Sequence, residues 1–129
     1  ISACLVGSEM CIRDRYNGLS VILDGRTDEL MTDIHTRQLV ESLMWEVVAG
    51  AKSTGRIIPE SFIQTMLDYT TKMKPYRTSM KIDFDEKRPL EVDAIFGNPL
   101  RKAELAGVNL QQIRCLYQQL KFLDMRNRS

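Results

Sequence analysis

The sequence has few of the residues that metal centres, disulfide frameworks and catalytic triads require. Its 129 residues include three cysteines and one histidine. Cys4, Cys11 and Cys115 are odd in number and lack the spacing of a metal motif or a disulfide framework. We therefore expect reduced thiols in a cytoplasmic protein, with Cys115 packed on an apolar helical stripe. His35, the single histidine, is expected to be exposed, and it supports neither a metal site nor a Ser–His triad.

Long apolar runs, strong net charge and a nucleotide-binding motif are also absent. No apolar stretch approaches the roughly 20 residues that span a bilayer. The formal net charge is +1 with 27% charged residues, so no strong field indicates nucleic acid or an anionic membrane as a partner. No G-x-G-x-x-G occurs, and we expect the seven glycines at helix ends or kinks.

Helical periodicity covers most of the chain, because apolar residues recur at i, i+3, i+4 and i+7. The expected helices are 16–23, 34–53 with Asp33 as its cap, 60–73, 79–87, 91–106 with an interruption at Gly97-Asn98-Pro99, and a last helix capped by Asn109. A short helical turn is expected at 27–31. The segment 79–87 also alternates as a strand would, but no second strand-like run exists to pair with it. The sequence therefore predicts one all-α domain of five or six helices.

The two ends of the chain differ from its middle. Residues 1–15, I-S-A-C-L-V-G-S-E-M-C-I-R-D-R, lack the charged and apolar regions of a secretion signal and resemble a translated sequencing adapter. We expect a non-native leader at 1–15, a helical domain at 16–125 and a polar, fraying tail at 126–129. A genuine disordered or helical leader is the alternative.

Small hydroxyls, carboxylates and arginines concentrate between Tyr76 and Asn98. Thr78 and Ser79 follow Pro75 and can cap a new helix. Glu91 opens the next helical pattern. Two successive helix starts could bring a hydroxyl and a carboxylate to one polar ligand, or they could be two ordinary caps.

The order T-S-M-x-x-D-x-x-x-x-R-x-x-E-V-x-A-I-x-G-N-P, from Thr78 to Pro99, resembles the signature of the C-terminal domain of ketopantoate reductases. The resemblance extends from about Tyr16 to Asp124. It implies an all-α domain of the 6-phosphogluconate dehydrogenase C-terminal-like type. Members of this family carry a Rossmann domain for NADP(H) in front of it, and that domain is missing from these residues.

The resemblance also implies an activity, the NADPH-dependent reduction of 2-dehydropantoate to pantoate for pantothenate and coenzyme A synthesis. The substrate would lie between the two domains, and a homodimer is among the implied assemblies. A related reductase of another 2-oxo or 3-oxo acid is one alternative. The other is a stand-alone helical interaction module that uses Trp45, for which core packing is the ordinary role, and the methionine-rich helix faces.

Three site residues follow from the resemblance. Asn17 matches the second asparagine of the family's K-x-x-x-N-x-x-x-N helix and would hold the hydroxyl end of the substrate. Ser79 would bind the substrate carboxylate, and Glu91 would lie near the nicotinamide ribose of the cofactor. Glu9 and Arg13 stand where the catalytic lysine and the first asparagine would be, so no catalytic residue is assigned and the chain alone is expected to be inactive.

Three further residues fall on family positions or near them. Thr27 stands where some members carry another substrate-binding asparagine, so the resemblance assigns it no definite role. Asp83 and Arg88 are expected to form a structural ion pair.

Overall fold

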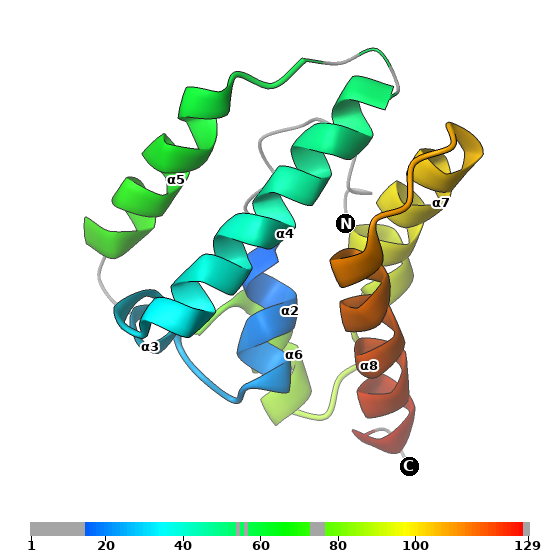
Figure 1. Cartoon of the computed structure of the whole chain (residues 1–129). Coiled ribbons are helices and arrows are strands. Elements are labelled where there is room, and N and C mark those ends of the chain that lie inside the picture. The colour runs from blue at the N-terminus through cyan, green and yellow to red at the C-terminus, as the bar shows by residue number, and fades with distance from the viewer. Residues whose placement is uncertain (1–14, 54, 56, 73–76, 128–129) are drawn as a thin grey trace.

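The computed structural model describes residues 15–53, 55, 57–72 and 77–127, and in these ranges it contains helices and no strand (Figure 1). The prediction of an all-α domain is therefore confirmed. The elements are α2 (Arg15–Ile22), α3 (Thr27–Thr32), α4 (Ile34–Ser53), α5 (Glu60–Lys72), α6 (Ser79–Asp85), the π-helix η1 (Asp93–Gly97), α7 (Asn98–Leu105) and α8 (Gln111–Asn127). None of these described helices combines the length and the apolar character needed to cross a membrane.

Helix α2 lies at the centre of the arrangement that concerns function. It packs against α3, α4, α6 and α8, and Figure 1 shows it behind the space between α4 and α8. Gly18 allows this close packing, because an added Cβ atom would lie 2.7 Å from Cζ of Phe96 and 2.9 Å from Cδ2 of Leu116. The apolar stripe expected on α4 is buried at Val40, Leu43, Met44, Val47 and Ala51, and its remaining member, Val48, is partly buried against the core.

Several predicted helix ends are confirmed by backbone geometry. Asp33 caps α4, since its Oδ2 accepts a hydrogen bond from the Thr36 N–H at 3.0 Å. Gly55 and Gly107 adopt positive φ angles of 87° and 83° after α4 and α7, a conformation that favours glycine. The expected Met73 end of α5 lies outside the described residues.

The cap of α8 differs from the prediction, which placed it at Asn109. The helix begins at Gln111. The carboxylate of Glu46, in α4, accepts the N–H groups of Gln112 and Ile113, each at 2.9 Å. A side chain 66 residues away thus satisfies the donors that a local cap would have taken.

The interruption at Gly97-Asn98-Pro99 takes the form of a π-helix followed by α7. Pro99 has no N–H group, so it cannot donate to the carbonyl of Ile95 as an α-helical residue would. The Arg15 guanidinium donates to that carbonyl at 3.0 Å and lies 4.4 Å from the centroid of the Phe96 ring. Because Pro99 does not donate to it, the Ile95 carbonyl can accept the hydrogen bond from Arg15, and this bond joins α2 to η1.

Three residues that border the expected domain lie in helices of the structure, while the domain limits themselves stay predictions. Arg15, expected in the leader, is the first residue of α2 and is fully buried. Arg126 and Asn127, expected in a frayed tail, continue α8, where the Asn127 amide donates to the Phe84 carbonyl at 2.9 Å. Residues 1–14, which include Glu9 and Arg13, and residues 128–129 lie outside the described part.

Three expectations about single side chains have mixed outcomes. Cys115 was expected on a buried stripe, but it is exposed. The reason is that α8 buries Ile113, Leu116 and Leu120, and neighbouring helix positions point about 100° apart. His35 is exposed as expected, and Trp45 is 37% exposed, so core packing does not fully cover it.

Candidate functional site

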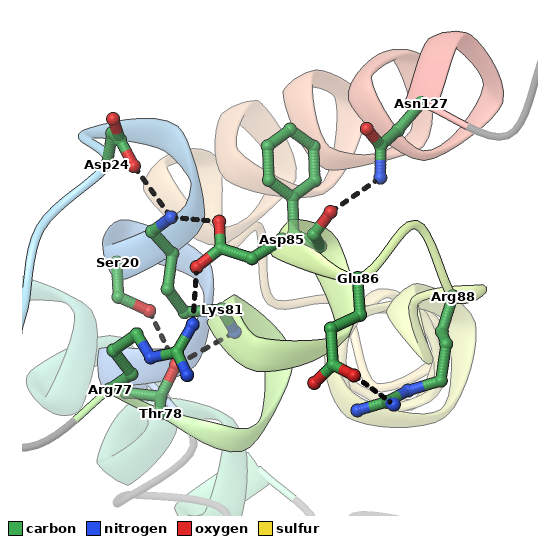
Figure 2. Close-up of polar contacts among 10 residues, drawn as sticks. Ser20, Asp24, Arg77, Thr78, Lys81, Asp85, Glu86, Arg88 and Asn127 are labelled. Atoms are coloured by element: carbon green, nitrogen blue, oxygen red, sulfur yellow. Dashed lines mark hydrogen bonds and ion pairs between the residues drawn. The ribbon is translucent and has the colours of Figure 1, made fainter.

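The seam between α2 and α6 brings the sequence-predicted residues Asn17 and Ser79 onto two helices that touch. Ser20 Oγ donates to the Asn17 carbonyl at 2.8 Å and lies 2.6 Å from Thr78 Oγ1. Because the Ser20 proton is used toward Asn17, the Thr78 hydroxyl is the donor in the second bond. Figure 2 shows Ser20 and Thr78 facing each other across the seam.

The start of α6 separates the roles of its two hydroxyl residues. Thr78 is the N-cap, and its Oγ1 accepts the Lys81 N–H at 3.2 Å. Ser79 is the first helical residue and is exposed. Its hydroxyl makes no hydrogen bond within the described part of the chain. The cap function therefore belongs to Thr78, and the Ser79 hydroxyl is available to a ligand.

Glu91 lies on the segment that joins α6 to η1. Its side chain is half-buried, and its carboxylate pairs with no residue that the structure describes. The segment is fixed by Leu90, whose N–H donates to Oδ1 of Asp124 at 2.9 Å. Asp124 lies in α8 and is itself buried. A carboxylate from α8 thus determines where Glu91 stands.

Asp124 was not singled out from the sequence, although a signal for it exists. It follows Leu116 and Leu120 at intervals of four residues, so it continues the buried stripe of α8. An acidic residue on a buried stripe requires a polar partner. The sequence could have flagged Asp124 as a buried hydrogen-bond acceptor, but not Leu90 as its donor.

Lys81 is a second residue that the sequence analysis missed. Its side chain is only 7% exposed, and its ammonium pairs with Asp85 and, at 2.6 Å, with Oδ1 of Asp24 just beyond α2. Arg77 donates to the other oxygen of Asp85 at 2.9 Å. Figure 2 shows these four side chains gathered on the side of α6 that lies next to α2. The i, i+4 spacing of Lys81 and Asp85 was the local signal for part of this cluster.

The ion pairs shift the pKa values of the two central groups in opposite directions. Burial disfavours the charged Lys81 ammonium, but hydrogen bonds to Asp24 and Asp85 outweigh it and raise the pKa of Lys81 above its ordinary value. The hydrogen bond from Lys81 lowers the pKa of Asp85, with partial burial opposing it. Both groups are therefore charged at neutral pH.

Asp93 anchors η1 to α8. The Tyr117 hydroxyl donates to its Oδ1 at 2.7 Å, and Lys121 lies 2.9 Å from its Oδ2. The hydrogen bond from Tyr117 and then that from Lys121 lower the pKa of Asp93. This arrangement fixes the helix that follows Glu91.

The remaining sequence-predicted residues have structural surroundings. Asp83 and Arg88 form the expected ion pair, with 2.9 Å between Oδ1 and Nε. Thr27 is 2% exposed at the start of α3, and Asn17 is 9% exposed in α2. In the part of the chain that the structure describes, no group of acidic, histidine or cysteine side chains is arranged to hold a metal ion.

The fold and the seam define an all-helical domain that offers an uncommitted hydroxyl and a carboxylate at two successive helix starts. The sequence model of the family described as Ketopantoate reductase PanE/ApbA C terminal matches residues 9–124. The chain therefore belongs to this family, and it corresponds to the helical C-terminal domain of such reductases.

Relatives agree with this assignment. The chain is 76% identical over 114 residues to a 2-dehydropantoate 2-reductase from Nostoc sp., covering 88% of this chain and 36% of that protein. The crystal structure of 2-dehydropantoate 2-reductase from Methylococcus capsulatus superposes with a TM-score of 0.86 at 30% identity, covering 93% of this chain and 39% of that one.

A dimeric ketopantoate reductase from Staphylococcus aureus has the same fold, with a TM-score of 0.84 at 20% identity, covering 92% of this chain and 42% of that one. The chain thus spans well under half the length of each of these relatives.

Proposed function

We propose that this chain is the substrate-binding domain of an NADPH-dependent 2-dehydropantoate 2-reductase and acts together with a nucleotide-binding domain. The observation that carries the proposal is the position of Ser79. It matches the family serine in T-S-M-x-x-D, and it is exposed at the start of α6, a helix that packs against α2, while Thr78 serves as the cap.

Ser79 would donate its hydroxyl hydrogen bond to the carboxylate of the substrate, at the positive end of α6. Asn17, on the neighbouring helix, would hold the hydroxyl end of the same molecule through its amide. Holding both ends fixes the ketone in one orientation, which is the main contribution of a binding domain to such a reaction.

Glu91 fits the cofactor side of the site, since its half-buried carboxylate has no partner in the described residues and Asp124 fixes its segment. It would contact the nicotinamide ribose and orient the ammonium of a lysine supplied from elsewhere. When bound, NADPH supplies the hydride. We assign no proton donor to this chain, so the chain alone should bind ligand without turnover.

The test is a chimera in which the Nostoc relative supplies all residues up to the position that matches Tyr16. Ser79→Ala should raise KM for 2-dehydropantoate by about tenfold to a hundredfold, because a charge-assisted hydrogen bond to the carboxylate is lost. The matched control is Ser42→Ala on α4, where the hydroxyl only bonds the Gln38 carbonyl of its own helix. Equal KM values for the two variants would contradict the assignment of Ser79.

The same chimera separates the alternative substrates. A panel of 2-oxo and 3-oxo acids should give the highest kcat/KM with 2-dehydropantoate. A higher kcat/KM with another oxo acid would transfer the proposal to a related reductase.

We also propose a homodimer in the cytoplasm as the working form. The dimeric relative from Staphylococcus aureus supports the assembly, and the cysteine count without framework spacing supports the compartment. Sedimentation of the chimera over a range of concentrations tests the dimer, and a monomer at all concentrations would exclude it.

A further inference from the structure

We propose that Lys81 is a positioning residue, which holds α6 against the end of α2 through Asp24 and Asp85 and thereby sets where Ser79 stands relative to Asn17. The inference rests on the proposed function, in which Ser79 and Asn17 bind the two ends of the substrate. It adds a residue that neither the family motif nor the substrate contacts identify.

The burial of Lys81 is the first observation. Lysine side chains are rarely this buried unless they are paired, and the Lys81 side chain is 7% exposed. Its ammonium has three donors, of which two are used by Asp24 and Asp85. The Phe84 ring lies 5.9 Å from the same nitrogen. Lys81 is therefore enclosed in the seam, whereas its partner Asp24 is 83% exposed.

The second observation is that α6 is attached to the α2 side at two points. The Thr78 hydroxyl bonds Ser20 at 2.6 Å, and Lys81 pairs with Asp24 at 2.6 Å. Ser79 lies between these two attachments in the sequence. One attachment would let a short helix pivot, whereas two attachments fix the direction of its axis.

The length of α6 makes these attachments necessary. It has seven residues, too few to be stable on their own, so its position depends on tertiary contacts. Arg77 and Asp85 close the network at the two ends of the helix, with 2.9 Å between Nη1 and Oδ2 (Figure 2). The cluster thus holds the helix that presents Ser79, without Lys81 itself contacting the substrate.

The experiment uses the chimera and two variants of the link. Lys81→Met removes the ammonium and keeps an unbranched side chain, and it should raise KM for 2-dehydropantoate about fivefold to tenfold with kcat changed less than about twofold. Asp24→Asn removes only the α2 end of the link. Asp24 has a φ angle of 53°, which asparagine also tolerates, so the turn is kept. This variant should raise KM about twofold to threefold.

Arg88→Met is the matched control. Arg88 pairs with Asp83 and Glu86 around the end of α6, and none of these side chains pairs with a described residue of α2. This variant should leave KM unchanged, which distinguishes loss of the α2 link from loss of any ion pair on α6.

Hydrogen exchange of the 129-residue chain provides a second readout that needs no activity. The Ile82 N–H, bonded to the Thr78 carbonyl at 3.0 Å, should exchange faster in Lys81→Met and Asp24→Asn than in Arg88→Met. If Lys81→Met unfolds the chain, Asp24→Asn decides, since it keeps Lys81 paired with Asp85.

The outcomes separate the two proposals. Raised KM together with faster α6 exchange supports the positioning role. Faster exchange with unchanged KM would mean that Lys81 forms a structural ion pair only, and it would overturn the proposal. The proposal is also overturned if Lys81→Met and Asp24→Asn give the same KM and the same exchange rates as the control Arg88→Met. An inactive chimera, or Ser79→Ala without effect, refutes the proposed function instead. Exchange then still decides whether Lys81 fixes α6 on α2.

Discussion

Thr78 and Ser79 are neighbours with the same hydroxyl chemistry, yet the start of α6 places them in different surroundings. Thr78 is 3% exposed, accepts the Lys81 N–H and donates to Ser20. Ser79 is exposed one residue later. A buried hydroxyl with several partners contributes to the stability of the fold. An exposed hydroxyl without protein partners has little effect on stability and can bind a ligand. The site thus divides support and binding between two adjacent residues.

This division predicts effects of different size on stability for two single substitutions in the isolated chain. Thr78→Val keeps the side-chain shape but leaves the Lys81 N–H and Ser20 without their partner, and it should lower the free energy of unfolding by about 1–2 kcal/mol. Ser79→Ala should change it by less than about 0.5 kcal/mol. Urea unfolding of both variants is the measurement, and equal losses of stability would contradict the separation of roles.

At the scale of elements, side chains that act across helices define the ends and contacts of their neighbours. Glu46 of α4 caps α8, Asp124 of α8 holds the Glu91 segment, and Arg15 of α2 donates to the Ile95 carbonyl within η1. Each of these contacts joins parts of the chain that are far apart in sequence. The ends and positions of these helices are therefore set in part by side chains of other helices.

The cap of α8 by Glu46 leads to a stability prediction. Glu46→Ala removes the acceptor for two N–H groups at a helix N-terminus, where a carboxylate also interacts favourably with the helix dipole. The free energy of unfolding should fall by about 1–2 kcal/mol. Glu41→Ala, on the same helix, is the control and should change it by less than about 0.5 kcal/mol. The account of this cap is wrong if the two variants are equally stable.

The packing of α2 against η1 and α8 leads to another stability prediction. In Gly18→Ala the added methyl group would lie 2.7 Å from Cζ of Phe96 and 2.9 Å from Cδ2 of Leu116. Relieving this overlap must move buried side chains, and the expected loss of stability is about 1–3 kcal/mol. Thermal unfolding followed by circular dichroism measures it. An unchanged melting temperature would show that α2 is less closely packed than described.

At the scale of the whole molecule, the ion pairs predict how stability depends on pH. The pKa values of Asp85 and Asp93 are lowered, so their contributions are present above the ordinary value of 3.8 and are lost as the pH falls through the lower folded values. The pKa values of Lys81 and Lys121 are raised, and their contributions persist up to the ordinary 10.5 and are lost above it.

Unfolding measured between about pH 5 and about pH 2 should therefore show stability falling with acid. In Asp93→Asn this decrease should be smaller, since the group that must be protonated is absent. The same acid dependence in the variant and in the unmodified chain would contradict the pairing of Asp93 with Lys121 and Tyr117.

The helical architecture was predictable because apolar periodicity is a local property of the sequence. The stripe of α4, the caps at Asp33 and Gly107 and the interruption before Pro99 all follow from residues within a few positions of each other. The seam was not predictable in this way. Ser20 and Thr78 are 58 residues apart, and no local pattern pairs Lys81 with Asp24 or Glu46 with α8.

The family motif identified Asn17, Ser79 and Glu91 as candidates without showing their surroundings. The structure adds which hydroxyl is the cap and which carboxylate holds the Glu91 segment. Their roles toward substrate and cofactor stay predictions. The domain limits do too, and genomic reads across the Tyr16 codon would decide whether residues 1–15 are native coding sequence.

The most direct test of the central proposal compares NADPH oxidation with 2-dehydropantoate by three proteins. These are the part of the Nostoc relative that precedes the position matching Tyr16, this chain alone, and the chimera of the two. The account predicts turnover by the chimera only, because substrate binding and hydride supply then lie in one molecule. A folded chimera without activity, beside an active intact Nostoc protein, would contradict it.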